Sequence, residues 1–151
     1  LEQMFYGRSR YTIDKKGRMT IPSGFRDDSP NGVVVTKGLD GNLMAYAKEV
    51  FDSYADSMNS ISLTDPNMRS LRRELLSNSK ELIYDAAGRV LIPLNLRKLA
   101  GIEDEVMILG VGNSLEIWDI NRLAEFEEAH SDPEAQAIAW ATLDISIKRG
   151  N

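Results

Sequence analysis

The chain has 151 residues, 42% of them apolar and 27% charged, so it can bury one sizeable core but not two large ones. It contains no cysteine, which excludes a disulfide framework, a thiolate metal site and a cysteine nucleophile. No apolar run approaches the roughly 20 residues that cross a bilayer, and the formal net charge of -5 argues at first against a nucleic-acid partner.

The N-terminal part of the chain is basic although the whole is acidic. Leu1 to Gln3 are interpreted as a remnant of an expression vector before a natural start at Met4, and with no signal-peptide segment we expect a soluble, cytoplasmic protein. Residues 4–26 contain six basic residues and one acidic residue, whereas residues 103–134 contain ten acidic residues and one basic residue. This asymmetry predicts one basic and one acidic surface on the same molecule.

The first half of the chain begins with a strand, a tight turn and a second strand. In the sequence "RYTIDKKGRMTI" the Asp14 side chain can accept hydrogen bonds from the backbone that follows it, and Gly17 tolerates positive φ. Pro22 then fits the first turn of a short helix. Further elements are indicated by apolar spacing and turn residues: strands within 32–38 and 42–46 and helices over 47–58 and 64–78.

The second half repeats this order. Sliding the sequence by 71 positions pairs Asp14 with Asp85, Gly17 with Gly88, Arg18 with Arg89, Ile21 with Ile92, Pro22 with Pro93 and Arg26 with Arg97. With one more residue inserted, Gly38 falls on Gly110, Leu43 on Leu115, Tyr46 on Trp118 and Phe51 on Leu123. We therefore expect a helix over 93–100 closed by Gly101, strands within 104–112 and 114–118, and a helix over 119–130.

Residues 132–150 predict one further helix with no counterpart in the first unit. A helix that caps the core and a helix that contacts another subunit are about equally compatible with its apolar residues, Ile138, Trp140, Leu143 and Ile147.

The duplication predicts the fold class and the organisation of the chain. The strands are too short for each unit to bury both faces alone, so the two units are expected to interleave into one barrel, which removes exposed strand edges. The resulting prediction is an α+β fold, an internally duplicated β-barrel with peripheral helices. Its parts are a first half-barrel repeat with a helix at 4–60, a connecting helix at 61–80, a second repeat with a helix at 81–130 and a helical tail at 131–151.

The sequence resembles the MraZ family of bacterial regulators associated with the division and cell-wall gene cluster. The resemblance rests on "MFYGRSRYTIDKKGRMTIPSGFR", on "VVVTKGLDGNLMAY" and on residues 62–119 with the second Asp-x-x-Gly-Arg turn; it extends from Met4 to about Ala129. It implies an AbrB-like swapped-hairpin barrel in which one chain forms a pseudo-dimer. It also implies a homo-oligomeric ring that binds direct repeats in double-stranded promoter DNA, is nucleoid-associated, and needs no cofactor.

The resemblance also implies which residues contact DNA. The turn of the family falls on Asp14 to Arg18 and, in its second copy, on Asp85 to Arg89. Lys15, Lys16 and Arg18 are expected to meet phosphates or a guanine edge, and Arg8 and Arg10, interpreted as flanking the turn across a hairpin, are expected to add phosphate contacts. Asp14, Gly17, Asp85 and Gly88 are assigned to turn geometry.

The second turn is less basic, because Ala86 and Ala87 replace the two lysines. Arg89 is therefore either a lone DNA contact or a structural partner of Asp85. A purely structural interpretation also exists for both turns, in which Asp and Arg form a salt bridge and the glycine serves geometry only. For Arg26 and Arg97 a structural role is favoured.

Two other classes of function fit the sequence less well. The related aspartates Asp14 and Asp85 lack the Asp-Thr/Ser-Gly loop of aspartic proteases, and the adjacent arginines would keep both carboxylates ionised, so no enzyme is predicted. His130 stands alone among carboxylates, which does not predict a metal site. The alternative to DNA binding is a protein-interaction or assembly module that uses the acidic helical face.

Overall fold

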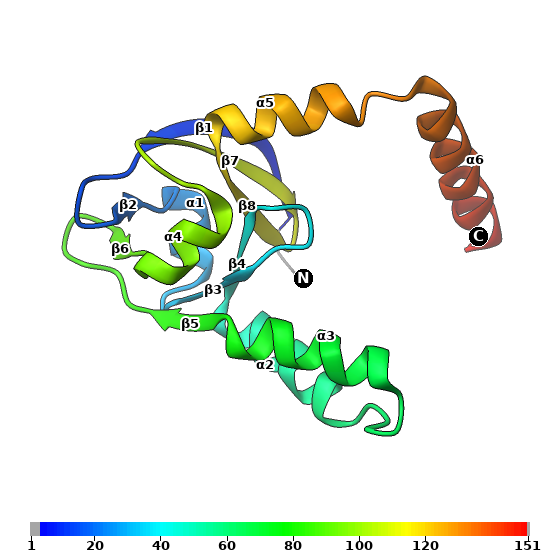
Figure 1. Cartoon of the computed structure of the whole chain (residues 1–151), viewed down its shortest axis with the longest axis horizontal. Helices are drawn as coiled ribbons and strands as arrows, with labels where there is room; N and C mark the ends of the chain where they lie inside the picture. Colours follow the sequence, from blue (N-terminus) through cyan, green and yellow to red (C-terminus); the bar gives the residue numbers. More distant parts are fainter. Residues whose placement is uncertain (1–3, 151) are drawn as a thin grey trace.

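The computed structural model describes residues 4–150, so the interpretation of Leu1 to Gln3 falls outside the described residues. Eight strands form two sheets (Figure 1). The six-stranded sheet has the order β1-β7-β8-β4-β3-β5, and β2 and β6 form a separate ribbon. The strand bounds are β1 Phe5–Thr12, β2 Arg18–Thr20, β3 Val33–Lys37, β4 Leu43–Ala47, β5 Ser79–Leu82, β6 Arg89–Leu91, β7 Glu105–Gly112 and β8 Ser114–Asp119.

The sheet order shows how the two units interleave. The first strand of each unit pairs with the hairpin of the other unit: β1 with β7, and β5 with β3. The two hairpins meet through β4 and β8, and β2 pairs with β6. The α+β class and the duplicated organisation are thus confirmed. Among the described residues, strand pairing ends at β1 and β5, and the β2–β6 ribbon packs against the same core as the sheet.

Two residue pairs mark the pseudo-twofold axis. Met19 lies opposite Val90 in the ribbon, and Met44 lies opposite Glu116 in the sheet. The first pair is 71 positions apart and the second 72, the two offsets at which the sequence matches itself. Each of these residues therefore pairs with its own counterpart, as it would across the axis of a homodimer.

One core serves both units. Its fully buried side chains come from the ribbon, the short helices and both hairpins: Met19, Ile21, Phe25, Val33, Val35, Leu43, Val90, Ile92, Leu96, Val106 and Ile117. Because the ribbon contributes Met19 and Val90 to this core, the side chains before and after them in each strand point outward.

The helices occur where the sequence predicts them: α1 (Ser23–Asp28), α2 (Lys48–Asn59), α3 (Pro66–Ser77), α4 (Leu94–Ala100), α5 (Ile120–Ala129) and α6 (Pro133–Arg149). Pro22 and Pro93 lie at the N-cap positions, one residue earlier than expected. Gly101 ends α4 with a φ of 62°, as predicted. No helix within residues 4–150 has the length and apolar character needed to span a bilayer.

Aromatic contacts fix one helix of each unit to its hairpin. The Tyr46 ring lies 6.0 Å from the Phe51 ring of α2 and 5.3 Å from that of Tyr54. At the counterpart position the Trp118 ring lies 5.0 Å from that of Phe126 in α5. The equivalence of Tyr46 and Trp118 is therefore maintained in their packing.

The last helix differs from its expected role. All residues of α6 are exposed, and Figure 1 shows the helix standing apart from the rest of the molecule. The interpretation of this segment as a helix that caps the core of its own chain is therefore wrong, because no residue of α6 is buried there.

Candidate nucleic-acid interface

The first Asp-x-x-Gly-Arg turn is organised by one carboxylate. Asp14 Oδ1 accepts hydrogen bonds from the backbone N–H groups of Lys16 at 3.0 Å and Arg18 at 2.9 Å. Its Oδ2 accepts one from Arg18 Nε at 2.6 Å. The turn closes with Gly17 N–H donating to the Asp14 carbonyl at 2.9 Å. The aspartate therefore fixes both the backbone of the turn and the orientation of the guanidinium.

The second turn has the same geometry. Asp85 Oδ1 accepts from the backbone N–H groups of Ala87 and Arg89, both at 2.9 Å, and its Oδ2 accepts from Arg89 Nε at 2.9 Å. The ion pair expected by the structural interpretation thus exists in both turns. It engages Nε of each arginine, and no hydrogen bond found within residues 4–150 uses the terminal nitrogens of Arg18 or Arg89.

The two turns support each other across the pseudo-twofold axis. Ile92 N–H donates to the Gly17 carbonyl at 2.8 Å, and Ile21 N–H donates to the Gly88 carbonyl at 3.1 Å. Arg97 packs over Gly17 and donates from Nε to the Ile92 carbonyl at 3.0 Å. Arg26 takes the same place over Gly88, with Nε 2.8 Å from the Ile21 carbonyl. These contacts agree with the structural role predicted for Arg26 and Arg97.

The turn geometry lowers the pKa of both aspartates. The backbone N–H of Arg18, followed by its side chain, lowers the pKa of Asp14 below the usual 3.8; Arg89 does the same for Asp85, again chiefly through its backbone N–H. A carboxylate with a lowered folded pKa adds stability that is fully present above the unfolded pKa. That stability is lost as the pH falls through the lower, folded value.

We therefore expect the combined variant Asp14→Asn and Asp85→Asn to be less stable than wild type at pH 7 and to approach it once the pH has fallen below the lowered pKa values of both aspartates. Protonation removes the same charge from the wild-type protein in that range. Urea unfolding measured by circular dichroism at several pH values checks this. A stability difference that stays constant over the whole range would contradict the assigned pKa shifts.

The outer face of the β2–β6 ribbon brings the two arginines together. Arg18 lies opposite Leu91, and Thr20 lies opposite Arg89. Since Met19 and Val90 point into the core, these four side chains share the outer face, and the arginines occupy diagonal positions on it. Figure 1 shows the ribbon and its turns on the opposite side of the molecule from α6.

The flanks of this face are unequal. Lys15 and Lys16 are exposed on the first turn, and exposed Ala86 and Ala87 occupy the same places on the second. The inequality continues beyond the turns: exposed Ile83, Leu91 and Leu94 stand where the first unit has Thr12, Thr20 and Ser23. The first unit thus presents the polar and basic half of the face, and the second unit the apolar half.

Arg8 and Arg10 lie elsewhere. The expectation that they flank the turn across a hairpin is wrong, because β1 pairs with β7, and strand pairing between the two sides of the first turn is limited, within residues 4–150, to the Ile13–Met19 bridge. Arg8 donates to Glu127 of α5 at 3.1 Å, and Arg10 donates to Glu105 at 2.7 Å. The Arg8 ion pair lowers the pKa of Glu127, chiefly through the side-chain hydrogen bond.

Other candidate chemistry is not assembled. His130 stacks on Phe126, with ring centroids 4.0 Å apart, and its Nδ1 lies 2.8 Å from the carbonyl oxygen of the same residue. Among residues 4–150, no three His, Asp or Glu side chains are placed to hold a metal ion. The sequence analysis missed Thr20 and Leu91, which complete the outer face of the ribbon. The sequence contains a signal for them: they are equivalent at the offset of 71, and each lies two positions after the arginine of its motif, on the same face of the strand.

Fold and site together define an internally duplicated α+β protein that presents two Asp-x-x-Gly-Arg turns beside one two-stranded ribbon. The family model described as MraZ protein matches residues 4–74 and 75–144. The chain therefore belongs to the MraZ family, as the resemblance implied.

Relatives with the name "Transcriptional regulator MraZ" match most of the chain. The protein from Pelotomaculum thermopropionicum is 42% identical over 145 residues, which are 95% of this chain and 100% of the relative. The relative from Mycoplasmoides gallisepticum is 40% identical, and the match covers 85% of this chain and 91% of the relative. The relative from Acetivibrio thermocellus is 37% identical, and the match covers 94% of this chain and 100% of the relative. These are names of regulators and not of enzymes, which confirms the prediction of a non-enzymatic protein.

Proposed function

We propose that this chain is a transcriptional regulator that binds double-stranded promoter DNA through the outer face of the β2–β6 ribbon and the two turns beside it. The observation that carries this proposal is the diagonal pair Arg18 and Arg89, each held at Nε by an aspartate and directed outward from the ribbon. The names of the relatives support the general role in transcription.

The geometry suits readout in the major groove, which admits a two-stranded β-ribbon. An arginine held at Nε keeps its terminal nitrogens for a bidentate contact with a guanine edge or a phosphate. Lys15 and Lys16, exposed on the first turn, contribute phosphate contacts. We assign Arg8 and Arg10 to peripheral phosphate contacts. To make these contacts, the two arginines must leave their hydrogen bonds with Glu127 and Glu105.

Self-assembly accounts for DNA binding by an acidic chain. One copy has few basic residues on the ribbon face, whereas a ring of copies would present several such faces to successive direct repeats at high effective concentration. The proposed target is the promoter of the division and cell-wall gene cluster, and the proposed location is the cytoplasm, in association with the nucleoid. The proposed division of the chain is two half-barrel repeats at 4–60 and 81–130, a connecting helix at 61–80 and a tail at 131–151.

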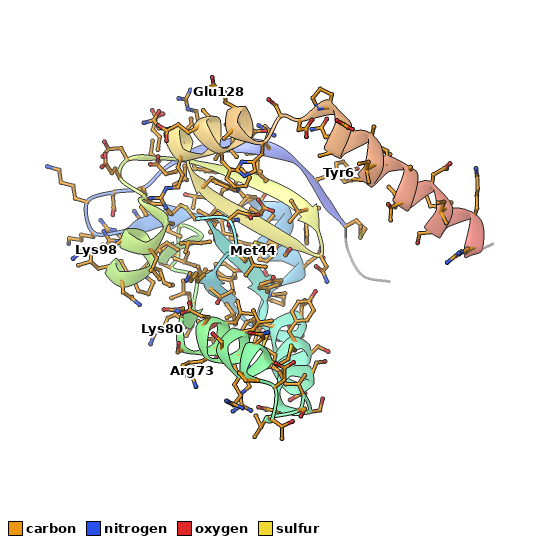
Figure 2. All side chains as sticks on the ribbon, turned by 45° about the vertical axis from the view of Figure 1, so that its right-hand side comes forward. Tyr6, Met44, Arg73, Lys80, Lys98 and Glu128 are labelled. Carbon is orange, nitrogen blue, oxygen red and sulfur yellow. The ribbon has the colours of Figure 1, made fainter. Side chains whose placement is uncertain are left out.

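The test is fluorescence anisotropy with the promoter fragment and a scrambled fragment over a salt series. We expect wild type to prefer the promoter and Arg18→Ala to bind it about 10-fold or more weakly, as loss of one bidentate base contact predicts. Arg73→Ala is the matched control, because Arg73 lies on α3, away from the ribbon (Figure 2).

Equal binding to both fragments would overturn sequence-specific regulation and favour the interaction module on the acidic helices. Specific binding that is unaffected by Arg18→Ala would keep the regulator but move the contact away from the ribbon.

A further inference from the structure

The helix α6 is the structural counterpart of α3, which the sequence did not reveal. In each unit the hairpin is followed by two helices, α2 and α3 in the first and α5 and α6 in the second. Both second helices begin with Asp-Pro: Asp65 accepts from the Asn67 N–H at 2.9 Å, and Asp132 accepts from the Glu134 N–H at 3.0 Å. The tail therefore has a counterpart in the first unit, contrary to the sequence-based prediction.

The two helices differ in what they contact. The α3 helix packs on the outer side of its own unit, where the Leu75 carbonyl accepts hydrogen bonds from Thr36 at 3.0 Å and from Ser79. Leu71 of α3 and Leu39 of the β3–β4 turn line the same cavity of about 350 Å³. No residue of α6 is buried in its own chain, and its large apolar side chains are exposed: Ile138, Trp140, Leu143, Ile145 and Ile147.

An exposed α6 requires a partner surface. Its apolar residues are spread around the helix, which is typical of a helix that is buried. Most helical stability in proteins comes from packing, and α6 buries no residue within its own chain. These features point to a covering surface outside this copy of the chain.

Part of the surface that corresponds to the α3 site is open on the second unit, beyond Arg8, which contacts Glu127 of α5. The pair Thr36–Ser79, which α3 covers, corresponds by pseudo-symmetry to the pair Leu109–Arg8. The next pair on that face is Tyr6–Val111, whose side chains are 89% and 40% exposed. Figure 2 shows Tyr6 near the start of β1, on the side of the body from which α6 extends.

We propose that α6 of one copy packs on the Tyr6–Val111 surface of a second copy, in the position that α3 occupies on the first unit. The inference rests on the self-assembly included in the proposed function. Each copy carries one unpartnered helix and one open site of the kind that accepts such a helix in the same fold. Unless two copies exchange their helices reciprocally, the contact is head-to-tail, and repetition of it produces a closed ring or an open filament.

The absence of cysteine allows a direct test by cross-linking. Ile138 holds the place in α6 that Leu71 holds in α3, and Val111 holds the place of Gly38, which lines the same cavity as Leu71. The full-length variants Ile138→Cys and Val111→Cys are co-expressed with different tags, treated with a short bis-maleimide and separated on a denaturing gel. We expect a cross-linked dimer with both tags, and none when Asp56→Cys, on the exposed side of α2, replaces Val111→Cys.

Each other result would overturn the inference. Cross-linking of Ile138→Cys with itself would show α6 paired with α6. A double variant Ile138→Cys and Val111→Cys that links only within one chain would show α6 folded back on its own body. Light scattering, which measures the mass of the assembly, separates this inference from the proposed function. An oligomer that forms no mixed cross-link would contradict this interface alone, whereas a monomer would contradict the proposed ring as well. DNA binding is tested independently by anisotropy.

Discussion

Replacing Lys15 and Lys16 together with alanine is expected to weaken promoter binding about 30-fold per bound chain at about 0.15 M salt. The substitution makes the first turn like the second, which has alanines at both places. The loss of two phosphate contacts reduces the slope of log affinity against log salt concentration by about 1.8. If the variant and wild type bind equally at about 1 M salt, this difference in slope corresponds to about 30-fold weaker binding at about 0.15 M salt. Both side chains are exposed, so the fold should be unaffected.

The second turn offers the reciprocal experiment. Ala86→Lys with Ala87→Lys is expected to strengthen DNA binding and to steepen the salt dependence, provided that the second turn also lies against the duplex. Anisotropy over a salt series measures both variants with the same promoter fragment. A first-turn variant with an unchanged salt slope would show that Lys15 and Lys16 do not meet phosphates.

Gly17→Ala is expected to destabilise the protein by about 1–3 kcal/mol, more than the equivalent change at Gly88. Gly17 has a φ of 95°, and a Cβ atom there would lie 2.8 Å from the Ile92 carbonyl oxygen, which belongs to the backbone of the other unit. Gly88 has a φ of 76°, and its nearest neighbours are side-chain atoms of Arg26, which can move. Gly88→Ala should therefore cost about 1–2 kcal/mol, mainly for the left-handed backbone.

Urea unfolding of the two glycine variants and wild type measures this difference. The matched control is Gly24→Ala, because a Cβ atom at Gly24 would have no neighbour within 4 Å and the residue has no positive φ. An equal loss at Gly17 and Gly88 would mean that the close contact with Ile92 is relieved at no cost.

The repeated motif made much of the fold predictable. The match of Asp14 with Asp85 located both turns. The offset of 71 positions in that match is also the sequence distance between Met19 and Val90, which pair on the pseudo-twofold axis. The helices followed from apolar spacing and from Pro and Gly at their ends. The role of Asp14 as the acceptor for the turn backbone was also predictable, because it depends on residues only two to four positions away.

Strand partners were not predictable in the same way. A short turn between two strands favours a hairpin, yet β1 leaves its neighbour and pairs with β7, far away in the sequence. Only the packing of both units around one core determines that choice. The contacts of Arg8 depend on this strand pairing, because its hydrogen-bond partner, Glu127, lies on α5 of the other unit. The equivalence of α6 and α3 was hidden for a related reason: apart from the Asp-Pro start their sequences differ, and element order reveals it.

The fusion of two units into one chain gives the ribbon a direction. A homodimer carries two equal turns and reads a duplex identically from either end, which suits palindromic sites. Here the lysines of the first turn have no equals on the second, where Ala86 and Ala87 stand. A copy turned end for end on the DNA would thus exchange a charged flank for an uncharged one. Copies that bind DNA in the same orientation match sites that are repeated head to tail. The difference between the two turns would therefore determine the direction in which the operator is bound.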